Sequence, residues 1–242
     1  MLLTDPSLYL ICLLIVAVGA MIQGTLGMGF GQIGAAGLIW TIPELLPGVV
    51  ILMAMLVGSF GAWREREGIN VFQLSWSMIG RFFGTMAAVP LLFWVSGSAD
   101  DYALMFACLI LMGVGCSIWR LSPPMGKSSL LGGGLASGIM GTITSVGAPP
   151  MGIVFQNEPA GSARPTLNAF FAIGSIPSLM ALGYSGHLNF QHFETALILF
   201  PGFFIGAWFS KYLHRYSDTR FRVWVVGFTG LSAVALLIRA LL

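Results

Sequence analysis

The stretch GTLGMGFGQ at residues 24–32 interrupts an apolar run that begins near Ser7 and continues to Pro43. Five glycines fall between Gly24 and Gly34, and each glycine destabilises a helix interior by about 1 kcal/mol relative to alanine. A continuous helix through this segment is therefore not expected. The stretch predicts a helix that breaks within a membrane-like run.

The composition is that of a polytopic membrane protein. Of the 242 residues, 57% are hydrophobic and 8% are charged, with a mean hydropathy of +0.88, whereas a soluble domain carries about 25% charged residues. The net charge of +2 and the scattered basic residues exclude a nucleic-acid partner, so the expected partner is the lipid bilayer. Apolar runs long enough to cross a membrane occur at residues 48–63, 72–95, 101–119, 165–184, 193–213 and 221–241.

Sequence motifs for catalysis or cofactor binding do not occur in the predicted spans. The three cysteines have no CxxC spacing and are expected to be buried hydrophobes rather than metal ligands. GFGQIG at residues 29–34 fits GxGxxG, but no alternation of strands and helices surrounds it, so a dinucleotide site is rejected. We expect no metal, no cofactor and no enzyme activity.

Two halves of the sequence contain matching pieces in the same order. GINVFQ at 68–73 matches GHLNFQ at 186–191, and GRFFG at 80–84 matches GFFIG at 202–206. Residue 186 follows residue 68 by 118 positions, and residue 202 follows residue 80 by 122. Both offsets nearly halve the chain, which predicts a tandem duplication.

A glycine-broken segment precedes each set of matches. The second is SGIMGTITSVGAPP at residues 137–150. We therefore expect one integral membrane domain with repeats at 1–122 and 123–242. The glycines of the matched GRFFG and GFFIG pieces lie in unbroken spans, where close helix packing is their expected role.

The basic residues indicate whether the broken segments cross the membrane or return. If each returns as a hairpin, one side holds nine of the 11 Lys and Arg residues, namely Arg64, Arg66, Arg120, Lys127, Arg164, Lys211, Arg215, Arg220 and Arg222. The other side then holds Asp5, Glu44, Asp100, Asp101 and Glu194. If each crosses, one basic loop must face outside, so the positive-inside rule favours hairpins.

The hairpin arrangement defines the expected fold. It is an all-α polytopic membrane protein of two inverted repeats, each a broken, re-entrant helix hairpin plus three transmembrane helices. Both termini are expected on the non-cytoplasmic side. The sequence is also compatible with a homo-oligomer.

The two breaks predict a binding site for a small anion. A helix that restarts after a break offers unpaired N–H groups and a partial positive charge. Irregular backbone at membrane depth must be buried or hydrated, so the two hairpin tips are expected to meet. The glycines could instead serve packing, but the recurrence of the break favours a site. The candidate substrate-binding residues are Gly24, Thr25, Gly27, Gly29, Gly31, Gln32, Gly141, Thr142, Thr144, Ser145 and Gly147.

Arg81 joins this candidate site. It lies nine residues into the apolar run 72–95, and an arginine in a membrane span is costly unless it is paired or hydrated, so a functional role is the default hypothesis. The expected role is an anion contact or a gate. At a depth of roughly 13 Å, the side chain could alternatively extend to the interface.

The charge pattern favours export or facilitated movement of an anion. No acidic residue lies in the middle of a predicted span, so no carboxylate is placed to relay protons. A negative-inside potential drives an anion out with about 2.3 kcal/mol per charge per 100 mV. A passive channel, or a membrane-embedded enzyme or assembly factor without net flux, stays open as an alternative.

The two glycine-broken segments, QGTLGMGFGQIG and SGIMGTITSVGAPP, resemble those of the TauE/SafE sulfite exporter family. The resemblance covers essentially the whole chain, although this sequence has GAPP where relatives often have GGPP. It implies a multi-pass protein of the bacterial inner membrane that transports sulfur-containing anions such as sulfite, thiosulfate or an organosulfonate.

Overall fold

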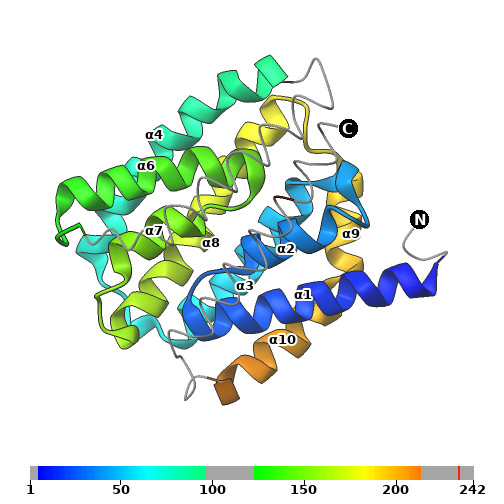
Figure 1. The fold of residues 1–242 in the computed structure, drawn as a ribbon, viewed down its shortest axis with the longest axis horizontal. Helices are drawn as coiled ribbons and strands as arrows, with labels where there is room; N and C mark the ends of the chain where they lie inside the picture. The colour runs from blue at the N-terminus through cyan, green and yellow to red at the C-terminus, as the bar shows by residue number, and fades with distance from the viewer. Residues whose placement is uncertain (1–4, 96–122, 214–233, 235–242) are drawn as a thin grey trace.

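A computed structural model describes residues 5–95, 123–213 and 234, and this part of the chain is helical without a strand. Figure 1 shows the helices packed side by side. In chain order they are α1 (Pro6–Leu26), α2 (Phe30–Leu38), η1 (Pro43–Leu45), α3 (Gly48–Arg64), η2 (Arg66–Gly68), α4 (Val71–Val95), α6 (Lys127–Thr144), α7 (Ala148–Phe155), α8 (Ala160–Tyr184), α9 (Phe190–Ile198) and α10 (Phe200–Leu213).

The first glycine-broken segment is a hairpin made of α1 and α2 (Figure 1). The chain turns at Gly27 and Gly29, whose φ angles of 78° and 111° favour glycine. The hydroxyl of Thr41, just after α2, accepts a hydrogen bond from the thiol of Cys12 in α1 at 3.3 Å. Since Cys12 lies in the first third of α1, the chain has returned towards its starting end, and the predicted hairpin is confirmed.

The second glycine-broken segment is a hairpin made of α6 and α7. Ser145 ends α6 with a φ of 61°. The hydroxyl of Ser137 in α6 donates to the carbonyl of Gly147 across the turn at 2.6 Å. Pro149 and Pro150 fall in the first turn of α7, where a missing N–H breaks no helical hydrogen bond. This hairpin is also confirmed.

Corresponding glycines bring corresponding helices together in the two halves. A Cβ atom added to Gly80 of α4 would lie 2.2 Å from the carbonyl oxygen of Leu131 in α6. A Cβ atom added to Gly202 of α10 would lie 2.8 Å from the carbonyl oxygen of Leu13 in α1. Both distances are too short for any residue but glycine, so the packing role predicted for these glycines is confirmed.

The same correspondence holds one helical turn further along. Here the added Cβ atoms would lie 2.1 Å from a carbonyl oxygen in both halves, in the pairs Gly84 with Leu135 and Gly206 with Ala17. The glycines of the two halves differ by 122 positions and their partners by 118, the two offsets found in the sequence. Each half therefore packs its hairpin against the other half's later helix, as a duplicated chain would.

Three of the six expected spans match single helices, although one of these, α3, is shorter than the helices that qualify as membrane spans. α3 and α4 agree with runs 48–63 and 72–95, and α8 begins five residues before run 165–184. Runs 101–119 and 221–241 lie outside the described residues except for residue 234, as does residue 122 at the expected repeat boundary. Among the described residues, α1, α4 and α8 are long and apolar enough to cross a membrane, and a fourth span results if α9 and α10 count as one.

The expected span over 193–213 is a bent pair of helices and not one straight helix. It consists of α9 and α10, which meet at an angle of 49°. Pro201 is the second residue of α10. Because proline lacks an N–H and its ring clashes with the carbonyl four residues earlier, it bends a helix at this place.

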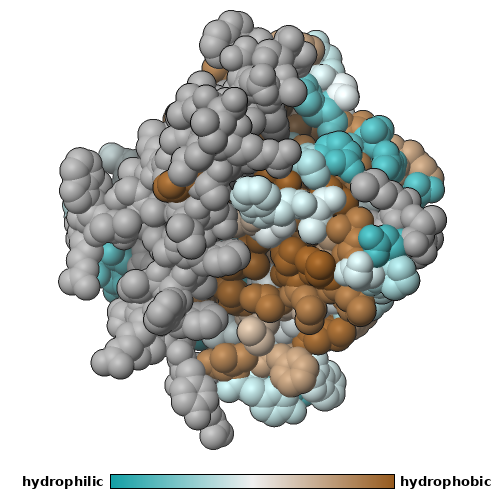
Figure 2. All heavy atoms as spheres, turned by 45° about the vertical axis from the view of Figure 1, so that its right-hand side comes forward, coloured by the Kyte–Doolittle hydropathy of each residue, from teal (hydrophilic) through white to brown (hydrophobic). Residues whose placement is uncertain are grey.

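Apart from Arg81, the described charged residues lie towards the two ends of the bundle. Arg64, at the end of α3, bonds Ser210 beside Lys211 at 3.0 Å. The acidic residues of the other end include Asp5, which caps α1, and Glu44 of η1. Between the ends, large hydrophobic side chains are exposed, and Figure 2 shows them as a patch with more polar residues above and below it. This surface suits a lipid environment.

Candidate functional site

Arg81 lies on the inner side of α4 with 3% of its surface exposed. One terminal nitrogen, Nη1, donates to the hydroxyl of Ser137 in α6 at 3.0 Å and lies 3.5 Å from the carbonyl oxygen of the same residue. The buried Nε has no hydrogen-bond partner. The side chain therefore does not extend to an interface, and the alternative expectation for Arg81 is wrong.

Two aromatic rings and three glycines surround the guanidinium group. Its central carbon lies 5.0 Å from the ring centre of Phe170 and 5.7 Å from that of Phe171 in α8. Cβ atoms added to Gly141 and Gly147 would lie 3.3 Å and 3.2 Å from the terminal nitrogens, and one added to Gly174 would lie 2.0 Å from Nε. Glycine at these places leaves room for the guanidinium between α4, α6 and α8.

No carboxylate neutralises Arg81 among the described residues. Both ion pairs that the structure describes use Glu65 in the loop after α3. The buried polar residues of the described helices include no aspartate or glutamate. A buried cation without an anionic partner is energetically unfavourable in the protein alone, so this position favours an incoming anion.

Three buried hydroxyls lie one helical turn beyond Arg81 and its neighbours. Thr142 in α6 bonds Thr85 in α4 at 3.2 Å and Ser178 in α8 at 2.9 Å. The hydroxyl of Ser178 also reaches the carbonyl oxygen of Gly174 at 3.1 Å. Polar side chains thus continue the Arg81 site further into the bundle.

The two hairpin turns touch through their backbones. A Cβ atom added to Gly31, in the first turn of α2, would lie 2.0 Å from the carbonyl oxygen of Ser145 in the second hairpin. Gly29 and the buried side chain of Gln32 lie beside this contact, since a Cβ atom at Gly29 would be 3.8 Å from the Gln32 Oε1. The prediction that the tips meet is confirmed.

Three candidates of the first break lie apart from Arg81, at the end of α1. The carbonyl of Gly24 accepts a hydrogen bond from Arg64 at 3.1 Å, and that of Thr25 accepts one from Arg164 at 2.8 Å. A Cβ atom added to Gly27 would lie 2.6 Å from the Arg164 carbonyl oxygen. These residues fasten the end of α1 to the basic end of the bundle.

Thr144 and Ser145 are engaged within the second turn. The hydroxyl of Thr144 donates to the carbonyl of Met140 at 2.7 Å and accepts from the amide of Val146 at 3.1 Å. The Ser145 hydroxyl donates to the Thr144 carbonyl. Both hydroxyls therefore shape the turn.

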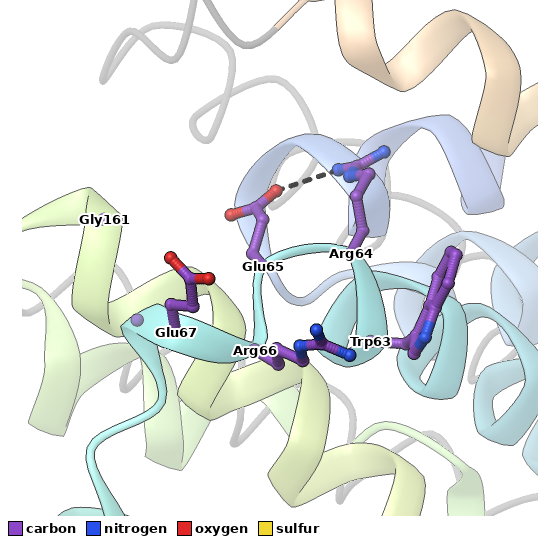
Figure 3. A pocket seen from close by; sticks show the side chains of 7 residues that line it. Trp63, Arg64, Glu65, Arg66, Glu67 and Gly161 are labelled. Carbon is purple, nitrogen blue, oxygen red and sulfur yellow. Dashed lines mark hydrogen bonds and ion pairs between the residues drawn. The ribbon is translucent and has the colours of Figure 1, made fainter.

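Two pockets open near the basic end. One, of about 140 Å³, lies between Thr25 and Met28 of the first break, Gln156 after α7, and Arg164 of α8. The other, of about 590 Å³, is formed by residues 63–68 and Gly161. Figure 3 shows its two arginines and two glutamates, with Arg64 paired to Glu65. Because two positive and two negative charges line the larger pocket, it has no net attraction for an anion.

Of the candidates named from the sequence, the structure brings Arg81, Gly141 and Gly147 together, and it brings Gly31 to Ser145. Sequence reasoning missed Ser137, although it lies at the start of the quoted SGIMG stretch. It also missed neighbours that only the packing of α8 reveals: Phe170, Phe171, Gly174 and Ser178. No cluster of three or more potential metal ligands occurs among the described residues.

The fold and this site define a multi-pass helical membrane protein with a buried arginine beside a helix break, and this arginine has no acidic partner among the described residues. The family model described as "Sulfite exporter TauE/SafE" matches residues 11–236, nearly the whole chain. The chain belongs to the TauE/SafE sulfite exporter family, which consists of membrane transporters of sulfur anions. No curated protein and no solved structure matches it.

Proposed function

We propose that this protein moves a small sulfur-containing anion across the bacterial inner membrane and binds it at Arg81. The observation that carries the proposal is the buried guanidinium, which has a hydrogen-bond partner in Ser137 but no acidic partner in the described structure. An anion at this position would replace the missing counter-ion. The family supports the sulfur chemistry of the substrate, which the side chains alone do not specify.

The depth of the site supports transport rather than binding at a surface. Ser137 lies ten residues into α6, counted from Lys127, or roughly 15 Å along a helix, which is about half the thickness of the hydrocarbon core. Because Arg81 is almost fully buried, an anion reaches it only when the helices around it move apart. Alternating access around a site near the midplane provides such a movement.

The distribution of charge supports an orientation. We assign the basic end, which includes Arg64 and Arg164, to the cytoplasm by the positive-inside rule. The 140 Å³ pocket beside Arg164 would then be the cytoplasmic access to the site. Both termini would lie outside the cytoplasm. Export is favoured because the membrane potential drives an anion outwards.

A membrane-embedded enzyme is the less favoured alternative. The groups around Arg81 are hydroxyls, glycines and phenylalanines, and none of them is a general base that could activate a nucleophile. A passive channel would differ from a transporter by flux that does not saturate with anion concentration.

Sulfite efflux from proteoliposomes tests the proposal. Replacing Arg81 by Gln removes a charged hydrogen-bond donor, so flux should fall by about 10- to 150-fold, while Arg81→Lys should keep part of it. Arg66→Gln is the matched control, because Arg66 is exposed in the loop after α3 and the change in net charge is the same. Normal flux in Arg81→Gln would remove Arg81 from the substrate site.

A further inference from the structure

The predicted duplication places no second cation at the position equivalent to Arg81. The offset of 122 that relates α4 to α10 places Phe203 at the position equivalent to Arg81. The ring of Phe203 packs edge-on against that of Phe60 at 5.9 Å between ring centres. The equivalent position in the second half is therefore apolar.

The hydrogen-bonding partner of Arg81 is not repeated either. The offset of 118 that relates α6 to α1 places Gly19 at the position of Ser137, and a Cβ atom there would lie 3.0 Å from the ring of Phe30. Among the described Lys and Arg residues, Arg81 alone is buried. The polar interior that the structure describes thus contains one positive charge.

Ser137 positions this charge and has no proton left for a ligand. Its hydroxyl donates to the Gly147 carbonyl, and its oxygen accepts from Arg81 Nη1. The rings of Phe170 and Phe171 turn their faces to the guanidinium, and an aromatic face is electron-rich and repels an anion. The other neighbours, Gly141, Gly147 and Gly174, carry no charge.

From this charge inventory we infer that the site selects singly charged anions over doubly charged ones. The inference rests on the proposed function of Arg81 as the substrate contact. A monoanion forms a neutral pair with the guanidinium. A dianion leaves one negative charge in a dry, aromatic environment, where an uncompensated charge is strongly disfavoured. The favoured species are hydrogen sulfite and organic monosulfonates, and the disfavoured ones are sulfite dianion, sulfate and thiosulfate.

Binding measurements on the purified full chain distinguish the effect of ligand charge from that of ligand shape. Methanesulfonate and sulfate share three sulfonyl oxygens but carry one and two negative charges. Calorimetry or ligand-induced thermal shifts should give a dissociation constant for methanesulfonate about 100-fold lower than that for sulfate. Sulfite should bind more weakly as rising pH converts hydrogen sulfite to the dianion, whereas methanesulfonate binding should not change over the same range. No titratable side chain of α6, α7 or α8 faces Arg81 in the described structure, so the sulfite effect would come from the ligand.

Arg81→Gln distinguishes the two ways in which the inference can fail. If sulfate binds wild type as tightly as methanesulfonate and both lose affinity in Arg81→Gln, Arg81 contacts the anion but selectivity for monoanions is refuted. If neither anion binds wild type, or if Arg81→Gln binds both as wild type does, the proposed site itself is refuted. Arg66→Gln serves as the control and should bind both anions as wild type does.

Discussion

Replacing Gly31 by alanine tests whether the contact between the hairpin turns sets the geometry of the site. The new Cβ atom would lie 2.0 Å from the carbonyl oxygen of Ser145. Cβ contacts below 3.0 Å essentially never occur, so the two turns must separate by roughly 1 Å. Both sides of the contact are backbone, and no side chain can rotate away to relieve it.

The separation should affect stability moderately and transport strongly. Overpacking a buried contact costs about 1–3 kcal/mol, which for a chain of this length lowers Tm by roughly 2–12 °C. A displacement of about 1 Å at a binding site can reduce rates about 100-fold. We therefore expect Gly31→Ala to fold, to melt at a lower temperature and to lose nearly all sulfite flux.

Differential scanning fluorimetry and proteoliposome efflux measure the two effects. Gly132→Ala is the matched control, because nothing lies within 4 Å of a Cβ atom at Gly132 in α6, and it should keep wild-type flux with a Tm that is equal to or slightly above that of wild type. Wild-type Tm and flux in Gly31→Ala would refute the tight contact. Equal losses in Gly132→Ala would show that the effect is not specific to the turns.

Three further substitutions test the packing and the polar contacts. Gly80→Ala forces α4 away from α6 and should lower Tm by roughly 2–12 °C, and an unchanged Tm would contradict the close approach of these helices. Arg164→Gln removes two charged hydrogen bonds, to the end of α1 and to Glu65. The free energy of unfolding in a urea titration should therefore fall by about 1.5–3 kcal/mol. An unchanged free energy would show that these bonds do not stabilise the fold. Thr142→Val breaks both hydroxyl contacts with α4 and α8 and should lower Tm by a few degrees, with a larger effect than Thr41→Val just after α2.

The hairpins could be predicted because local signals define them. Gly27 and Gly29 adopt positive φ angles that glycine favours, and the two prolines after Ser145 fit only the first turn of a new helix. The grouping of basic residues on one side predicted that each broken segment returns to the side from which it started, and this needs no knowledge of packing. Such signals depend only on residues that are close in sequence, so they can be read from one sequence.

The composition of the site could be predicted only in part. Arg81 stood out because a charge in an apolar run is rare, but Phe170 and Gly174 look like ordinary residues of an apolar helix until α8 packs beside α4. Gly24 and Thr25 were expected at the site because they adjoin the break. They lie elsewhere because the last turn of α1 packs against Arg64 and Arg164, and sequence alone did not indicate these partners from α3 and α8.

In the proposed alternating-access cycle, the ion-paired arginines at the basic end would make the two directions of opening unequal. Opening there would break the bonds from Arg64 and Arg164 to the end of α1 and disturb both ion pairs of the described chain. The opposite end, as far as it is described, is held by neutral contacts such as that between Cys12 and Thr41. An empty carrier built this way would rest mainly in one state, and its turnover would be limited by the return step that reopens the basic end.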